Sequence, residues 1–305
     1  MVASPRTKCL SIRRTCPLAG RRSTSRQPRP RSSTRPATWI RIRHRRTMPE
    51  RPVVVRSTAA LDPSLGRLAV SVGVFDGLHL GHAYLLAALE RQAAAWHARP
   101  AVITFDAHPD AVLRGEAPPL LLDPAERERL LAAAGVEVIV VEHFDDRLRT
   151  TAYDEFVRRI ADRVDLAGFV MTPDAAFGYE RRGTSDALLI LAAEMSTPFV
   201  VAVVPPFSVD GRPVSSSDIR RLVMSGDLAG AERLLGRPYA VVGSTGARGR
   251  LSFGLPVALP PPGEYRVSLD SRVVLAQIDA DRSLALDPAP PDGTNRLRVV
   301  FEAQS

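Results

Sequence analysis

The chain has 305 residues, of which 45% are hydrophobic and 24% are charged, and this composition is typical of a folded globular protein. No apolar stretch reaches the roughly 18 residues that a membrane helix needs, so we expect no membrane partner. The formal net charge of +8 comes from the first 47 residues, which contain thirteen arginines, one lysine and no acidic residue. The remainder carries 27 basic and 33 acidic residues, so we expect no nucleic-acid partner.

Residues 1–47 form a leader rich in Arg, Ser, Thr and Pro, which we predict to be disordered because it has no apolar core. Its composition is typical of an organelle transit peptide. The abrupt change of composition at Met48 favours another interpretation, in which translation begins at Met48. Both cysteines, Cys9 and Cys16, lie in the leader, so the rest of the chain has no disulfide or cysteine nucleophile and suits a cytoplasmic location.

Short apolar runs alternate with helical patterns between residues 68 and 207. This alternation predicts an α/β fold with a doubly wound parallel sheet of five strands, because nearly unbroken apolar strands need cover on both faces. Asp123 is the expected N-cap of the second helix, with Pro124 at its first position. The expected strands are 68–75, 100–106, 136–144, 167–173 and 198–207, and the expected helices are 81–97, 123–135, 152–164 and 184–195.

The pattern changes near residue 237, after two further predicted helices over 216–226 and 228–236. The tail contains only short strand-like runs separated by Pro and Gly, which predicts a small antiparallel β domain. We therefore expect an α/β domain over 48–237 and a β domain over 238–305.

The segment 71–82 reads SVGVFDGLHLGH and joins the first predicted strand to the first helix. Gly73 and Gly77 permit close approach of the backbone to a ligand, and the helix start near Gly81 offers unpaired N–H groups to an anion. His79 and His82 are three residues apart and fall on one helix face, where both imidazoles can donate to phosphate oxygens. This arrangement predicts a phosphate site at the carboxyl edge of the sheet.

The wording GVFDGLHLGH resembles the HxGH signature of the nucleotidyltransferase superfamily, in the form found in prokaryotic FAD synthetases, which are bifunctional riboflavin kinase/FMN adenylyltransferases. Three later segments resemble that family in the same order: TFDAHP (104–109), FVMTPDAAFGYERRG (169–183) and the stretch from VSSSDIR to GRPY (214–239). The resemblance implies a Rossmann-like nucleotidyltransferase domain that transfers AMP from ATP to FMN, with Mg²⁺ as cofactor and ATP and FMN as substrates.

The resemblance also implies roles for particular residues. Catalytic roles fall on His79, His82 and Arg220, and the arginine fork is suited to pairing with a polyphosphate. In the flavin segment, Asp174 is an expected hydrogen-bond acceptor and Phe177 an expected stacking partner, although Thr172 and Ala175 depart from the family pattern. The expected ATP-binding residues are Gly73, Phe75, Asp76, Gly77, Gly81, Ser216 and Ser217, and the expected flavin-binding residues are Asp106, His108, Asp174, Phe177 and Gly178.

The segment 246–259 resembles the entry to the family's riboflavin kinase module, but Val257 and Leu259 stand where the family has threonine and asparagine. Aliphatic side chains supply no oxygen ligand for Mg²⁺ and ATP, so we expect the kinase activity to be lost. Two alternatives stay open: an HxGH nucleotidyltransferase with another phosphate acceptor, and a non-catalytic flavin- or nucleotide-binding regulator. The sequence does not indicate the oligomeric state.

Overall fold

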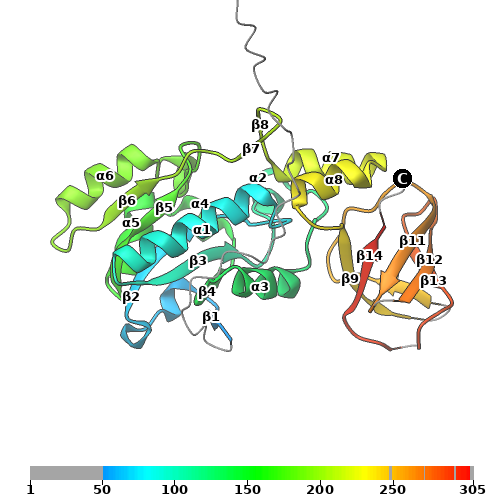
Figure 1. Cartoon of the computed structure of the whole chain (residues 1–305). Helices are drawn as coiled ribbons and strands as arrows, with labels where there is room; N and C mark the ends of the chain where they lie inside the picture. The colour runs from blue at the N-terminus through cyan, green and yellow to red at the C-terminus, as the bar shows by residue number, and fades with distance from the viewer. Residues whose placement is uncertain (1–50, 247–248, 271, 292, 303–305) are drawn as a thin grey trace, which may run out of the picture. The chain divides into compact units, whose positions relative to one another are not determined.

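A parallel sheet of six strands forms the first part of the fold (Figure 1), in the order β1-β4-β3-β2-β5-β6. This computed structural model describes residues 51–246, 249–270, 272–291 and 293–302. The predicted leader, with Met48 and both cysteines, lies outside these residues. The strands are β1 (Val53–Val55), β2 (Arg67–Val72), β3 (Arg99–Phe105), β4 (Val138–Glu142), β5 (Asp165–Met171) and β6 (Val200–Val203).

The predicted α/β class and parallel sheet are confirmed, but the predicted number of five strands is wrong. The additional strand is β1, which pairs in parallel with β4 at the edge of the sheet. Its three valines are half-buried or exposed and follow a proline, so no long apolar run marks them in the sequence.

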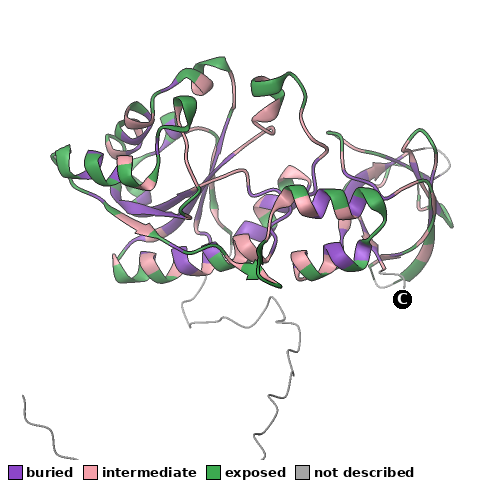
Figure 2. Cartoon of the chain, turned by 90° about the horizontal axis from the view of Figure 1, so that it is seen from above, coloured by how far each residue is buried: buried purple, intermediate pink, exposed green. Residues whose placement is uncertain are grey.

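Helices cover both faces of this sheet, because alternate residues along each strand point to opposite sides. In β2, Ala69 belongs to the core under α1 and α3, whereas Leu68 and Val70 belong to the core under α5 and α6. Figure 2 shows the strands largely buried and the outer faces of the helices exposed. The helices of this part are α1 (Leu80–Ala95), α2 (Asp110–Arg114), α3 (Pro124–Ala133), α4 (Asp146–Thr150), α5 (Tyr153–Ala161) and α6 (Ser185–Glu194), with 3₁₀ turns at Thr58–Ala60, Pro63–Leu65 and Tyr179–Arg181.

Strand β2 lies at the point where the chain reverses its direction of travel across the sheet. From β2 the chain proceeds through β3 to β4, and it then returns to place β5 on the other side of β2. Ligands of doubly wound sheets bind at such a reversal, outside the carboxyl ends of the strands. The loop that follows β2 carries the histidine motif, so the fold places that motif at the expected position.

The last part of the chain forms a closed antiparallel barrel in the order β10-β13-β12-β11-β14-β9. The predicted antiparallel β region is thus confirmed, while the boundary at residue 237 stays a prediction. Helices α7 and α8 share a hydrophobic core with the barrel. The elements are β7 (Ser208–Val209), β8 (Arg212–Pro213), α7 (Ser216–Ser225), α8 (Leu228–Leu235), β9 (Ala240–Thr245), β10 (Arg250–Ser252), β11 (Gly263–Leu269), β12 (Arg272–Ile278), β13 (Leu284–Asp287) and β14 (Leu297–Phe301).

The barrel is joined by backbone hydrogen bonds to the loop that precedes α3. The N–H of Leu120 donates to the carbonyl of Pro256 at 2.8 Å, and the N–H of Ala258 donates to the carbonyl of Leu120 at 2.8 Å. Val257 therefore lies in a parallel bridge with Leu120, and Leu259 is 2% exposed. The two aliphatic residues of the kinase-like segment are used here in packing.

Candidate active site

The loop after β2 is held in an unusual backbone conformation. Phe75, Gly77 and Leu78 have φ values of 53°, 78° and 40°, in the left-handed region that L-residues seldom occupy. Within the described part of the chain, the backbone N–H groups of residues 74–77 donate no hydrogen bond. A run of free N–H groups in a loop with left-handed residues suits an anion, so this loop is a candidate phosphate cradle.

The carbonyls of the same loop are occupied by side chains from distant parts of the sequence. Thr104 Oγ1 donates to the carbonyl of Val74 at 3.0 Å, and Arg127 Nη1 donates to the same oxygen at 3.2 Å. Ser216 Oγ donates to the carbonyl of Asp76 at 2.8 Å. These bonds fix the oxygens of the loop on the protein side, which leaves its N–H groups for a ligand.

His79 and His82 lie together at the start of α1, as the sequence predicts. His79 is the N-cap of the helix, and its Nδ1 accepts a hydrogen bond from the N–H of His82 at 3.3 Å. The two rings stack with centroids 3.8 Å apart and an interplanar angle of 17°. Because Nδ1 of His79 acts as an acceptor, its proton resides on Nε2, which is then available to donate to a ligand.

Both histidines are neutral at physiological pH. Burial, followed by the nearby charge of Arg237, lowers the pKa of His79 to about 4. Burial also lowers the pKa of His82 well below its usual range, and the charges of His79 and Arg237 add to this effect. The Nδ1 atom of His82 is buried and has no hydrogen-bond partner among the described residues. The pair therefore acts through N–H donors and not through a permanent positive charge.

Asp76 and Arg220 form a buried ion pair beside the loop. Arg220 Nη2 lies 3.0 Å from Asp76 Oδ2, and its Nε donates to the carbonyl of Pro119 at 2.7 Å. The N–H of Leu121 donates to both carboxylate oxygens of Asp76, at 3.0 and 3.1 Å. In this structure Arg220 thus connects three segments of the site, and its predicted contact with a polyphosphate stays a prediction.

The predicted glycine and serine residues surround this loop. A Cβ at Gly81 would lie 3.1 Å from the ring of His79, and a Cβ at Gly73 would lie 3.1 Å from the ring of Phe75. The helix α7 begins at Ser216, but its N-cap is Ser215, which accepts from the N–H of Asp218. Ser217, in the first turn of this helix, is exposed.

Asp106 and His108, which follow β3 and are expected to bind the flavin, lie in different surroundings. Asp106 Oδ2 lies 2.6 Å from Nδ1 of His143, which is exposed and whose pKa this hydrogen bond raises. His108 Nδ1 accepts from the N–H of Asp110 at 3.2 Å. Burial lowers the pKa of His108, with Asp110 and Asp76 acting in the opposite direction. His108 thus lies within electrostatic range of the phosphate loop.

The remaining expected flavin residues follow β5, beside the start of α5. Phe177 packs against the core residues Phe156 and Phe169, with ring centroids 5.5 and 5.7 Å away. Gly178 has φ 75°, and a Cβ there would lie 2.7 Å from Tyr153. Asp174 is exposed. The structure thus brings the histidines and the residues of the loop after β2 together, and it places these three at a separate strand end of the same sheet edge.

Sequence reasoning missed three charged residues near the loop: Glu126 and Arg127, which are buried, and Arg237, which is partly buried. Arg127 is 3% exposed and bonds the carbonyls of Val74 and Phe105. Arg237 bonds the carbonyls of Gly77 and Leu78. Arg237 lies inside the GRPY stretch that resembles the family, so that match was the one signal in the sequence that pointed to it.

Two negative findings apply only to the residues in the described ranges. No three His, Cys, Asp or Glu side chains there lie close enough together to hold a metal ion. None of the helices there combines the length and apolar character that crossing a bilayer requires.

Similarity to known proteins covers most of the described chain. A family model described as FAD synthetase matches residues 62–218. A bifunctional riboflavin kinase/FMN adenylyltransferase from Pseudomonas fluorescens is 31% identical over 71% of this chain and 73% of its own length. The corresponding protein from Haemophilus influenzae is 30% identical over 57% of each chain, less than two thirds of that relative. A crystal structure described as a macrolide-efflux protein from Streptococcus pneumoniae, 23% identical, covers 82% of this chain and 97% of its own with a TM-score of 0.67, which indicates a shared fold.

Proposed function

This chain belongs to the FAD synthetase family, and we propose that it is an FMN adenylyltransferase that converts ATP and FMN to FAD and pyrophosphate. The observation that carries this proposal is the loop after β2, whose free N–H groups adjoin two stacked histidines at the reversal point of the sheet. The named activity of the relatives supports the choice of FMN as acceptor.

In the proposed reaction, a phosphate oxygen of FMN attacks the α-phosphorus of ATP in line. The new P–O bond joins FMN to the adenylyl group, and the bond from the α-phosphorus to the bridging oxygen breaks, so that pyrophosphate leaves with the electron pair. Nε2–H of His79 donates to the phosphate whose charge increases in the transition state. The loop N–H groups at residues 74–77 hold the rest of the polyphosphate.

Mg²⁺ enters this proposal bound to ATP. The carboxylate of Asp76, the acidic side chain of the loop itself, is engaged by Arg220 and by the N–H of Leu121. Mg²⁺ in phosphate-transfer sites retains waters and substrate phosphates as ligands, so it needs few protein oxygens here. When bound, the ion neutralises charge on the phosphates.

The acceptor side of the proposed site uses the ends of β3 and β5. Asp106 and His108 follow β3, and Asp174 and Phe177 follow β5. We propose that the exposed carboxylate of Asp174 accepts from the flavin and that the partly exposed side chain of Phe177 contacts its ring.

We also propose that the barrel has no riboflavin kinase activity. Val257 and Leu259 are packed in the contact with Leu120 and in the barrel core, where they supply no oxygen ligand. The cytoplasmic location and the absence of a nucleic-acid partner stay predictions.

The experiment incubates the protein with Mg-ATP and either FMN or riboflavin and resolves the products by chromatography. We expect FAD from FMN and no product from riboflavin. FAD from riboflavin would show that the kinase is intact, and no product from either would favour the regulator. A product formed with a different phosphate acceptor would favour another nucleotidyltransferase of the HxGH type.

A variant tests the role of the first histidine. His79→Asn keeps an oxygen to cap α1 but removes the Nε2–H donor, and we expect it to reduce turnover roughly a hundredfold, as for one preorganised donor. The control is His97→Asn, since His97 is exposed at the other end of the same helix. Equal turnover in the two variants would refute the assignment.

A further inference from the structure

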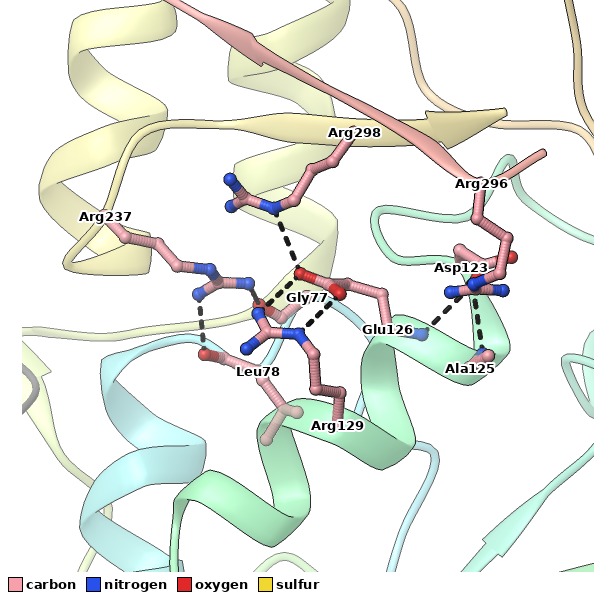
Figure 3. Close-up of polar contacts among 9 residues, drawn as sticks. All are labelled: Gly77, Leu78, Asp123, Ala125, Glu126, Arg129, Arg237, Arg296 and Arg298. Atoms are coloured by element: carbon pink, nitrogen blue, oxygen red, sulfur yellow. Dashed lines mark hydrogen bonds and ion pairs between the residues drawn. The ribbon is translucent and has the colours of Figure 1, made fainter. Parts of the chain in front are cut away.

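Arg237 connects the histidine loop to the segment that enters the barrel. It lies between α8, which ends at Leu235, and β9, which begins at Ala240. Its Nη2 donates to the carbonyl of Gly77 at 2.6 Å, and its Nη1 donates to the carbonyl of Leu78 at 3.0 Å. Figure 3 shows the guanidinium facing these two carbonyls. One side chain thus binds two consecutive carbonyls, 160 and 159 residues away in the sequence.

The two carbonyls belong to the part of the loop that most needs support. Gly77 and Leu78 both have positive φ, and leucine is disfavoured in that region because of its Cβ. His79 follows directly and must present its ring to α1 and to a ligand. A fork that binds both carbonyls fixes the direction of the two peptide planes immediately before His79.

A buried carboxylate lies beside the guanidinium of Arg237. Glu126, in the first turn of α3, is 6% exposed and accepts hydrogen bonds from Arg129 at 2.7 and 2.8 Å. Its Oε1 also accepts from Nε of Arg298 in barrel strand β14 at 3.1 Å. Figure 3 shows this group next to Arg237. The carboxylate partly compensates three guanidinium groups, which permits a partly buried cation close to the histidines.

We propose that Arg237 is a positioning residue of the transferase site, and that it fixes the peptide planes of Gly77 and Leu78 so that His79 and His82 face the phosphates. This inference rests on the proposed adenylyltransferase function and deepens it. We assign Arg237 no contact with either substrate, because its Nη groups donate to the carbonyls of Gly77, Leu78 and Leu235.

The charge of Arg237 provides a second, separable effect. It adds to burial in lowering the pKa of His79 and of His82. Burial lowers the pKa of Arg237 itself to about 10, the charges of Arg298 and Arg129 act in the same direction, and Glu126 and Tyr239 oppose them. Arg237 is therefore still a cation at pH 7, and it helps burial to keep His79 in the neutral form whose Nδ1 accepts from the N–H of His82.

The test compares Arg237→Lys and Arg237→Gln with Arg233→Gln, a control at an exposed arginine on α8. The first measurement is kcat and KM for FAD formation, with one substrate varied while the other is saturating. The second is the pKa of His79, followed by NMR with ¹⁵N-labelled histidine. The NMR measurement needs no FAD formation, so failure of the proposed function and failure of this inference are distinguishable.

We expect kcat to fall roughly tenfold to a hundredfold in Arg237→Gln, with KM changed much less, because the loop loses its preorganised geometry. Arg237→Lys keeps the charge but not the two-donor fork, so we expect a fall of roughly threefold to tenfold. The pKa of His79 should stay low in Arg237→Lys and rise in Arg237→Gln. The inference is overturned if Arg237→Gln matches Arg233→Gln, or if Arg237→Lys has the kcat of the unaltered protein. The kcat of Arg237→Lys tests the inference even if Arg237→Gln does not fold.

Discussion

Removing the charge of Asp76 should destabilise the protein strongly. The substitution Asp76→Asn preserves the shape of the side chain and an oxygen for the N–H of Leu121, but its amide group opposes Nη2 of Arg220. The side chains of Asp76 and Arg220 are only 3% and 11% exposed, so the guanidinium stays buried without its carboxylate. Breaking a buried pair in this way costs about 3–5 kcal/mol, a large share of the roughly 5–15 kcal/mol of a typical domain.

The measurement is urea and thermal unfolding of Asp76→Asn beside Asp165→Asn. The control residue lies 3.9 Å from Arg67 in a surface pair whose side chains are 64% and 46% exposed, so its loss should cost at most about 1 kcal/mol. For a domain of this size, Asp76→Asn should lower Tm by roughly 10 °C. Equal Tm values for the two variants would show that the Asp76–Arg220 pair contributes no net stability and would refute this reasoning.

Two further perturbations test the site. His79 has a pKa of about 4 when folded and a usual value of 6.5, so the unfolded chain binds its proton first. Stability should therefore fall by about 2 kcal/mol between pH 7 and pH 5, and His79→Asn should reduce this loss in urea titrations at the two pH values. Gly178→Ala places a Cβ 2.7 Å from Tyr153 at φ 75°, so it should cost about 1–3 kcal/mol and weaken FMN binding measured by fluorescence. A Cβ at Gly254 would have no atom within 4 Å, so Gly254→Ala should change neither stability nor FMN binding. Equal stability and equal FMN binding in the two glycine variants would contradict the packing argument.

The elements of the α/β part were predictable because their signals are local. Continuous apolar runs marked β2 to β6, and Asp123 with Pro124 marked the start of α3, where Asp123 Oδ1 accepts from two backbone N–H groups. Strand β1 was not predictable in the same way, since three half-exposed valines become a strand only by pairing with β4. The barrel strands β10 and β13 are similarly short, and closure of the barrel depends on pairing across the whole tail.

The part of the candidate site that lies within one short segment could be predicted from the sequence. The stretch 71–82 holds the glycines, the histidines and the helix start, and the structure brings them together. The residues that support this segment come from far along the chain, at Arg127, Ser216 and Arg237. Their contacts are made to backbone carbonyls. Every residue has a backbone carbonyl, so a single sequence does not indicate which one a distant side chain will bind.

The placement of Arg220 gives a physical reason for retaining the barrel in a chain whose kinase-like segment is altered. Arg220 holds Asp76, and Asp76 in turn binds the N–H of Leu121. The neighbouring Leu120 is held on both its N–H and its carbonyl by Pro256 and Ala258 of the barrel segment. The loop after β2 is therefore connected to the barrel by hydrogen bonds on either side of the Leu120–Leu121 peptide. Under this account, selection on the transferase site would preserve the barrel even without any chemistry of its own.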